Sequence, residues 1–418
     1  MSTTDLKAAY RTIMEDHFPP RMEISFIADD DSRQTLCYEK GTWQIDGIEK
    51  GLRYGENPGQ EAALYRLVNG NLTLGEVTAV QAGRYLASNV ELLQSGKHPG
   101  KTNITDADNA LNILRYLMDT PCAVIVKHNN PCGVAKGQTL AEAYDKANMA
   151  DRLAAFGGAI ALNRPCDVET ANLICENYAE VVVAPEFEAG VMDIFARKKN
   201  LRVMRINNMA KLQDFAVERF VDFKSLIDGG LVAQWSFQPQ IRTPQDLLPA
   251  VVEYKGQTYK VNREPTAQER DDMIFGWLVE AGVTSNSVLY VKNGVTVGIG
   301  TGEQDRVGVA QIARDKAYTK LADRICWEQH GIPFNTLENS DDRQIIQEAV
   351  KSQNGGLTGA CMVSDAFFPF RDGIDVGLRE GVTAVVQPGG SLRDYEVIEA
   401  CNEYNAAMCF TGQRSFKH

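Results

Sequence analysis

The chain has 418 residues, of which 44% are hydrophobic and 23% charged, and its formal net charge at pH 7 is −12. This length allows two or three domains with a large core, and the composition is typical of globular proteins. The negative charge argues against nucleic acid as the main ligand, because phosphate backbones are bound by positive surfaces.

Three features that the sequence lacks indicate the cellular compartment of the protein. Nine scattered cysteines without a CxxC pair argue against a disulfide scaffold and favour a reducing compartment. The first ten residues lack the apolar segment of a secretory signal, and no apolar run approaches the roughly 20 residues of a membrane helix. We therefore expect a cytoplasmic protein that binds neither membrane nor nucleic acid.

The chain begins with an extension, residues 1–50, in which Glu23–Ala28 and Thr35–Tyr38 are predicted strands. A polar loop with one arginine, Arg53, follows among Gly and Pro residues. An arginine in a rigid loop can bind a phosphate or carboxylate group with two parallel hydrogen bonds. A surface turn with an incidental arginine explains this loop equally well, and both interpretations stay open.

The most informative segment is the apolar run Ala123–Val126, which predicts a buried strand and leads directly into Lys127 and His128. The residues Asn129–Gly133 then predict a turn. Ligands of α/β proteins bind at the ends of parallel strands, and this pair combines a fixed positive charge with a group that exchanges protons near neutral pH. Two solvated side chains are the alternative, but the pairing at a strand end favours a catalytic role.

Helices and strands then alternate, which predicts a parallel α/β layer. We expect a glycine pair, Gly157 and Gly158, to bring the backbone close to a ligand or to form a tight bend. The pattern loosens over residues 206–265, a predicted connecting region. The predicted helices of this part are 140–152, 168–178 and 192–200, and the predicted strands are 159–162 and 180–184.

The two halves of the chain, residues 51–205 and 266–418, show similar plans, which suggests an internal duplication. A predicted helix, 266–282, precedes a hairpin around Asn293 and Gly294, and a second helix starts at Val307. The glycines of 298–302 do not fit a dinucleotide fingerprint, because a hairpin precedes them and the third glycine comes too early. A loop with three phenylalanines, 367–370, walls a pocket or packs in the core. The basic tail after the strand 407–410 is expected to stay near a site, although termini usually fray.

Taken together, these motifs resemble one enzyme family. They are LRYGENP (52–58), VKHNNPCGVA (126–135), AFGGAIALN (155–163), TSNSV (284–288), VGIGTGEQDR (297–306), SDAFFPFRDG (364–373), QPGGS (387–391) and FTGQRSFKH (410–418). In this order they resemble the transformylase part of the bifunctional purine-biosynthesis enzyme that formylates aminoimidazole carboxamide ribotide (AICAR) and cyclises the product to IMP. The resemblance covers about residues 50–418.

The resemblance implies an α/β fold of duplicated cytidine-deaminase-like α/β/α subdomains, with halves at 51–205 and 266–418 joined by 206–265. It implies a formyltransferase that moves the formyl group of 10-formyltetrahydrofolate to the 5-amino group of AICAR, without a catalytic metal. It also implies a homodimer with active sites shared between the subunits.

The resemblance also assigns residues. Lys127 and His128 match the catalytic pair: His128 takes the amine proton, and Lys127 stabilises the oxyanion and assists the leaving folate nitrogen. The matched nucleotide contacts are Arg53, Tyr54, Gly157, Glu180, Asn286, Arg306, Phe367 and Arg414. In the family, Asn286 and Arg306 match contacts made across the dimer interface. The matched folate contacts are Val307, Asp372, Gly390 and Ser391.

The sequence departs from the family pattern at three places. Only 52 residues precede Arg53, so we expect no IMP cyclohydrolase domain and a separate cyclohydrolase in the pathway. Gly59 replaces a histidine, and the tail carries Ser415 and Lys417. These changes concern substrate detail more than the reaction.

The sequence also bears on three other functions. A zinc nucleoside deaminase would need a second cysteine where Ala135 stands, so zinc ligation fails. An ATP- and formate-dependent synthesis of formyl-AICAR has no P-loop motif in its favour, although other ATP-binding folds lack that motif too. A non-catalytic nucleotide-binding protein would not need Lys127 and His128 intact.

Overall fold

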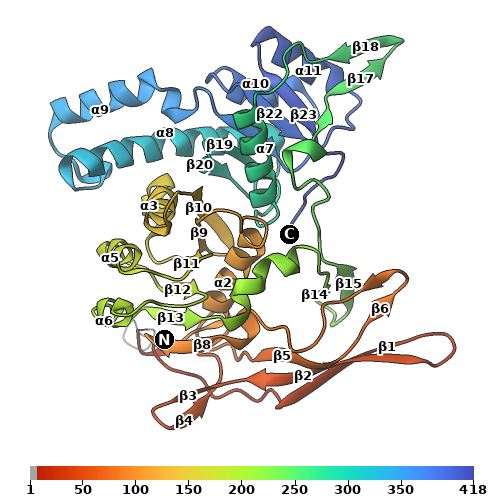
Figure 1. Ribbon diagram of the computed structural model, residues 1–418, viewed down its shortest axis with the longest axis vertical. Coiled ribbons are helices and arrows are strands. Elements are labelled where there is room, and N and C mark those ends of the chain that lie inside the picture. Colours follow the sequence, from red (N-terminus) through yellow and green to blue (C-terminus); the bar gives the residue numbers. More distant parts are fainter. Residues whose placement is uncertain (1–6) are drawn as a thin grey trace. The chain divides into compact units, whose positions relative to one another are not determined.

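The fold is described from a computed structural model, which describes residues 7–418. The chain forms two compact units. The first comprises the chain up to Met118 together with Gly157–Gln238, and the second comprises Asp119–Phe156 and Pro239–His418. Each unit combines helices with β-sheet (Figure 1), which confirms the predicted α/β class. Within the described residues, no helix is both long and apolar enough to span a bilayer.

The described part of the first unit contains two larger groups of strands and three two-stranded pairs, β3–β4, β6–β7 and β14–β15. An antiparallel sheet has the order β1-β2-β5, and the strands β11, β12 and β13 pair in parallel, with β8 antiparallel to β13. The strands β11 and β12 are entirely buried, which explains their apolar sequences. The bounds are β1 Arg21–Ile27, β2 Arg33–Gly41, β3 Trp43–Ile45, β4 Ile48–Lys50, β5 Leu64–Gly70, β6 Thr73–Leu74, β7 Val77–Thr78, η1 Ala87–Asn89, β8 Glu91–Gln94, α2 Lys101–Leu114, β11 Ala159–Leu162, α5 Val168–Glu176, β12 Val181–Ala184, α6 Val191–Phe195, β13 Arg202–Arg205, η2 Asn207–Ala216, β14 Val221–Ser225 and β15 Leu231–Trp235.

The second unit contains a mixed sheet with the order β16-β23-β22-β21-β19-β20-β10-β9. Its bounds are β9 Cys122–Lys127, β10 Asn130–Lys136, α3 Leu140–Ala150, α4 Arg152–Ala155, η3 Pro244–Asp246, β16 Leu248–Pro249, β17 Val251–Tyr254, β18 Gln257–Lys260, α7 Ala267–Glu280, β19 Val288–Lys292, β20 Val295–Gly300, α8 Arg306–His330, η4 Phe334–Thr336, α9 Ser340–Ser352, η5 Asn354–Gly356, β21 Cys361–Ser364, α10 Arg371–Leu378, β22 Ala384–Gln387, α11 Asp394–Glu403 and β23 Ala407–Phe410.

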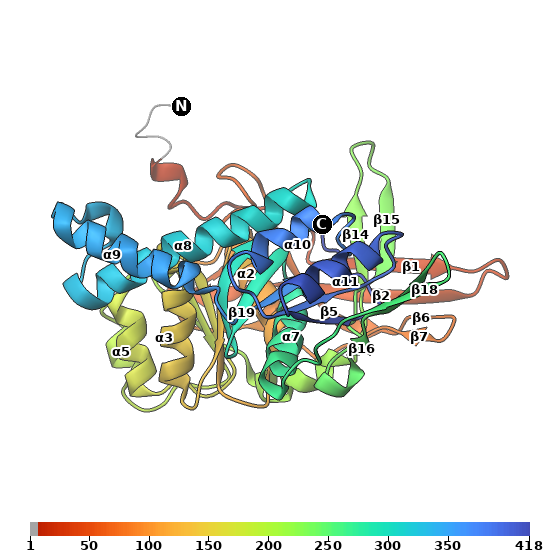
Figure 2. The same cartoon turned by 90° about the horizontal axis from the view of Figure 1, so that it is seen from above.

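Helices cover both faces of this second sheet. Successive side chains of a strand point to opposite faces, so Tyr290 and Val291 of β19 face different helices. The hydroxyl of Tyr290 donates to the Ala310 carbonyl of α8, whereas Val291 packs beside Gly276 of α7. Figure 2 shows α7 on one side of β19 and both α8 and α10 on the other. The sheet is thus the middle layer of an α/β/α arrangement.

The segment after β9 corrects one prediction. The predicted turn Asn129–Gly133 is correct only at Asn129, because Asn130–Lys136 forms strand β10, antiparallel to β9. The turn consists of His128 and Asn129, whose φ angles are 54° and 61°. Two successive residues with positive φ form the type I′ turn that the twist of a hairpin favours. Pro131 is accommodated at a bulge between Pro131 and Gly133, where a strand tolerates the missing N–H.

The same order of elements occurs twice along the chain. A helix (α2) is followed by the hairpin β9–β10, then by α3, β11, α5, β12, α6 and β13, with the short helix α4 inserted after α3. Later, α7 is followed by the hairpin β19–β20, then by α8, β21, α10, β22, α11 and β23, with η4, α9 and η5 inserted after α8. The second hairpin turns at Asn293 and Gly294, which confirms the prediction from this dipeptide.

A buried ion pair at the start of α7 predicts an acid-sensitive fold. Glu269 caps α7 by accepting the N–H of Thr266 and bonds both terminal nitrogens of Arg263, each at 2.8 Å. Burial alone would raise the pKa of Glu269, but these hydrogen bonds outweigh it and lower the pKa to about 2. A carboxyl with a lowered pKa stabilises the folded state above its ordinary pKa and loses this contribution as the pH falls.

We therefore expect the free energy of unfolding of the wild type to fall between about pH 5 and pH 2, with Glu269 as a main contributor. In Glu269→Gln this part of the decline should be missing, and the variant should be less stable than the wild type at pH 7. Urea unfolding at pH 7 and pH 3.5 measures both effects, with the exposed Glu399→Gln as control. An equally steep decline in wild type and Glu269→Gln would contradict this assignment.

Several cysteines lie in the core of the protein. Cys166, Cys361, Cys401 and Cys409 are free thiols, and each side chain is buried. Burial raises the thiol pKa in all of them, for Cys409 to about 11. At neutral pH these thiols stay protonated and pack as small apolar side chains.

Candidate active site

The hairpin β9–β10 presents the two predicted catalytic residues in different ways. Lys127 is the last residue of β9, and its Nζ donates to the carbonyl oxygen of Phe156 at 2.7 Å. His128 occupies the first position of the turn, and its side chain is exposed. The left-handed conformation is uncommon for residues other than glycine, although His, Asn and Asp adopt it more often than most. The hairpin therefore holds an ammonium group and an accessible imidazole on adjacent residues.

The base of this turn is tied to the loop that precedes β19. The side-chain oxygen of Asn130 accepts the backbone N–H of Thr284 at 2.8 Å and lies 3.0 Å from the hydroxyl of Thr301. That hydroxyl is also 2.9 Å from the carbonyl of Thr284. The polar motifs at 126–135, 284–288 and 297–306 thus meet around one amide side chain.

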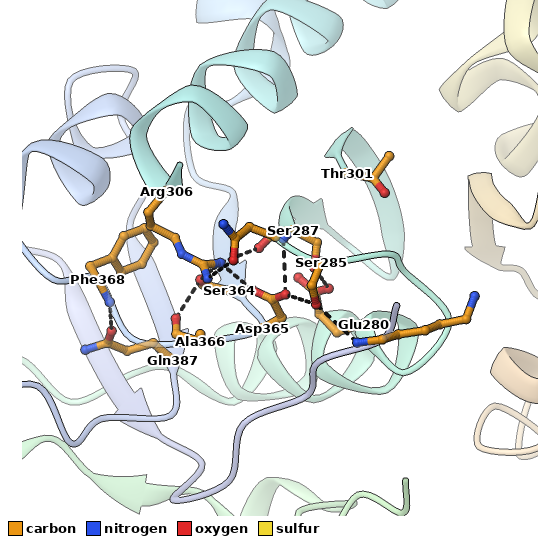
Figure 3. A network of polar contacts seen from close by, with 12 residues as sticks. Glu280, Ser285, Ser287, Thr301, Arg306, Ser364, Asp365, Ala366, Phe368 and Gln387 are labelled. Atoms are coloured by element: carbon orange, nitrogen blue, oxygen red, sulfur yellow. Dashed lines mark hydrogen bonds and ion pairs between the residues drawn. The ribbon is translucent and has the colours of Figure 1, made fainter. Parts of the chain in front are cut away.

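Arg306 is buried, and its guanidinium binds protein groups from two segments, residues 286–287 and 364–365. It forms an ion pair with Asp365 and donates to the side-chain oxygen of Asn286 at 2.8 Å and to the carbonyl of Ser287 at 3.2 Å. Asp365 also accepts the hydroxyl of Ser285 at 2.6 Å and the N–H of Ser287 at 3.2 Å. Figure 3 shows Arg306, Ser285 and Ser287 directed toward Asp365. Arg306 therefore fixes Asn286 in this subunit.

A second carboxyl, Glu280, lies at the back of this network. Ser287 donates its hydroxyl to Glu280 at 2.5 Å, and the Glu280 side chain is fully buried. Burial, followed by the nearby charge of Asp365, raises the pKa of Glu280 well above its ordinary value. A raised pKa favours the neutral form of Glu280 beside the Arg306–Asp365 ion pair.

The Phe367 loop and the glycine turn after β22 are joined by a glutamine. Gln387, at the end of β22, accepts the N–H of Phe368 at 2.8 Å and donates to Asp394 at 3.2 Å (Figure 3 shows the first of these bonds). Asp394 in turn accepts the N–H groups of Gly390 and Ser391 at 2.7 and 3.0 Å. Both N–H groups are thus occupied within the loop.

The remaining predicted residues of the second unit are at or near the surface. Phe367 is 40% exposed, Val307 is half-buried in the first turn of α8, and Asp372 is exposed in the first turn of α10. Arg414 is exposed in the tail and lies over the ring of Phe416 at 4.1 Å. All of these positions are accessible to a ligand.

The first unit brings together the predicted residues of the first motif. Arg53 is buried, donates to the carbonyls of Tyr10 and Lys97 at 3.2 and 3.3 Å, and lies over the ring of Tyr54 at 4.5 Å. The carbonyl of Tyr54 accepts the first N–H of α2, that of Lys101, at 2.9 Å. A helix N-terminus beside an arginine favours anions.

Glu180 and Gly157 belong to the same unit. Glu180 accepts hydrogen bonds from Asn103 of α2 at 3.2 Å and from Arg202 at 3.3 Å. Arg202 is fully buried, and burial is the main reason why its pKa is lowered. Gly157 has a φ of 79° and donates its N–H to the carbonyl of Tyr178 at 2.7 Å, so a side chain at this position would strain the backbone.

Sequence reasoning missed Asp365, Gln387, Asp394 and Arg202. Asp365 lies within the recognised motif SDAFFPFRDG, but no feature of the sequence indicates that it pairs with Arg306. Gln387 and Arg202 are buried polar residues at the ends of the strands β22 and β13, and a buried polar group needs a partner. That rule could have marked both residues as members of polar networks, although not their partners.

Comparison with known proteins places this chain in a family. Residues 8–316 match the family model described as "AICARFT/IMPCHase bienzyme". The chain is 39% identical over 371 residues to the "Bifunctional purine biosynthesis protein PurH" of Chlorobaculum parvum, and 38% identical over 373 residues to the protein of that name from a Ruegeria species. These matches cover 88% and 89% of this chain but 59% and 60% of the relatives. Relatives named as bifunctional give no support to the predicted separate cyclohydrolase. The chain belongs to the AICARFT/IMPCHase bienzyme family.

Proposed function

We propose that this chain transfers the formyl group of 10-formyltetrahydrofolate to the 5-amino group of AICAR. The observation that carries the proposal is the pair of adjacent residues Lys127, at the end of β9, and His128, in the β9–β10 turn, in a chain from this family. An amine conjugated to an electron-poor ring is a weak nucleophile, so it needs a base as it attacks and a cation as negative charge develops.

In the proposed reaction, the amino nitrogen of AICAR attacks the formyl carbon while the imidazole of His128 accepts one amine proton. The ammonium of Lys127 stabilises the oxyanion of the tetrahedral intermediate. The bond from the formyl carbon to the folate nitrogen then breaks, and that nitrogen leaves with a proton. Formyl-AICAR and tetrahydrofolate are the products, and no metal takes part.

The binding roles are proposed for the residues that match the family motifs. Arg53 and Tyr54 at the start of α2, together with Arg414, would contact the nucleotide, and Phe367 would lie against its base. The other proposed nucleotide contacts are Gly157, Glu180, Asn286 and Arg306, and the proposed folate contacts are Val307, Asp372, Gly390 and Ser391. An acid at Asp372 suits the amino-pyrimidine edge of a pterin.

We also propose that the chain consists of two duplicated cytidine-deaminase-like halves and acts as a homodimer with shared active sites. The repeated order of elements supports the duplication, since both series contain a hairpin between two helices and three parallel strands. The proposed halves are residues 51–205 and 266–418, and residues 206–265 connect them.

A formyl-transfer assay tests the proposed function. The purified chain is incubated with AICAR and 10-formyltetrahydrofolate, and tetrahydrofolate release is followed together with the nucleotide products. We expect formyl-AICAR to accumulate without IMP, because all the proposed site residues have roles in formyl transfer and none has a role in ring closure. IMP as a product would contradict the expected absence of cyclisation, but it would not contradict the expected formyl transfer.

Two further reactions distinguish the alternatives. Turnover with formate and ATP, but not with the folate, would replace the proposal by an ATP-dependent synthesis of formyl-AICAR. Binding of AICAR without turnover under either condition would leave a non-catalytic nucleotide-binding protein.

A further inference from the structure

The C-terminal tail is bound to the segments that form the candidate active site. Ser415 is buried and donates its N–H to the carbonyl of Asp365 at 2.9 Å. The backbone of Lys417 forms two hydrogen bonds with Ser285: its carbonyl accepts the backbone N–H of Ser285 at 2.9 Å, and its N–H donates to the Ser285 hydroxyl at 3.2 Å. That hydroxyl also donates to Asp365. The tail is therefore part of the Arg306–Asp365 network.

The side chain of Lys417 reaches a different segment. Its Nζ donates to the carbonyl of Asn129, in the β9–β10 turn, at 3.2 Å, and to the carbonyl of Gly282 at 3.2 Å. Hydrogen bonds from a charged donor are stronger than those between neutral groups. One ammonium group thus joins the turn that carries His128 to the loop that carries Asn286.

This turn needs support from outside itself. His128 and Asn129 are both in the left-handed region, which is sparsely populated by residues other than glycine. Such conformations persist where the surrounding structure holds them. The Asn130 side chain holds one end of the turn through Thr284, and Lys417 holds the carbonyl of Asn129.

We propose that Lys417 is a positioning residue, whose ammonium group holds the His128–Asn129 turn in the orientation that places the imidazole against the amine of the nucleotide. This inference rests on the proposed function. Lys417 does not touch the reacting atoms, so its loss should affect the chemical step far more than the binding of AICAR. A displacement of about 1 Å in a catalytic group can lower a rate about 100-fold.

The test compares Lys417→Met, which removes the charge, with Lys417→Arg, which keeps it, and with Lys351→Met on the exposed end of α9 as control. We expect kcat of Lys417→Met to fall about 10- to 100-fold, with KM for AICAR changed less than about 3-fold. Lys417→Arg should recover most of this loss, and the control should match the wild type.

Amide hydrogen exchange on the same proteins separates this inference from the proposed function. In Lys417→Met, exchange should accelerate in the segment 128–130 and stay unchanged in the buried strand β22. Unchanged exchange at 128–130, or equal acceleration in both segments, would overturn the inference. A wild type without formyl transfer would refute the proposed function, while the exchange result would still decide whether Lys417 holds the turn.

Discussion

His128→Asn is expected to lower kcat of formyl transfer by about 100- to 10,000-fold, the usual contribution of a general base. Asparagine is the sharpest replacement, because it adopts the left-handed conformation required at position 128 and cannot accept the proton. Alanine would lose the imidazole and strain the turn at once, so its effect would mix two causes. Steady-state kinetics with AICAR and 10-formyltetrahydrofolate measure the result.

The matched control is His330→Asn, which changes an exposed histidine at the end of α8. Lys127→Met should lower kcat to a similar extent as His128→Asn, and the double variant should lose less than the product of the two single effects, because the pair acts in one step. A His128→Asn enzyme within about threefold of the wild type would remove His128 from the chemistry and leave its neighbour Lys127 as the candidate.

Asp365→Asn should destabilise the protein by about 3–5 kcal/mol, because it leaves the buried guanidinium of Arg306 without its counter-charge. The change also weakens the bonds that fix Ser285, Ser287 and, through Arg306, Asn286. Formyl transfer should therefore fall even at temperatures where the variant stays folded. Urea unfolding gives the stability, and the formyl-transfer assay gives the activity.

Asp315→Asn is the matched control, since it breaks an exposed ion pair with Arg314. Exposed pairs contribute about 0–1 kcal/mol, so this variant should unfold close to the wild type. If Asp365→Asn were no less stable than this control, the buried Arg306 would not require Asp365 as its counter-charge, which would contradict the proposed role of this ion pair.

The two hairpins show how far local sequence determines structure. The turn at Asn293 and Gly294 could be predicted, because this dipeptide is the common type I′ pair. The turn at His128 and Asn129 has the same backbone conformation, but histidine is not a turn residue by type, and Pro131 argued against a strand. The prediction therefore placed the turn too late, and it missed that Lys127 is paired with Asn130 across a hairpin.

The candidate site shows a different limit. The motifs identified the segments that meet, and the tail, which was expected to stay near a site, is hydrogen-bonded to Asp365 and Ser285. The bonds between segments could not be predicted, because Arg306 and Asp365 lie 59 positions apart and Lys417 and Asn129 lie 288 apart. Such pairs depend on the packing of strands and helices, which the periodicity of a single segment does not contain.

The buried thiols also give the chain an internal reporter of its own unfolding. The thiolate is the form of cysteine that attacks thiol reagents, so Cys166, Cys361, Cys401 and Cys409 stay unreactive while they are folded into the core. Each becomes modified only when its surroundings open. Labelling at each cysteine, resolved by mass spectrometry, would then follow opening of the first unit through Cys166 and of the second unit through the other three. Without any introduced probe, the kinetics of modification would reveal whether the two units unfold as one cooperative block or separately.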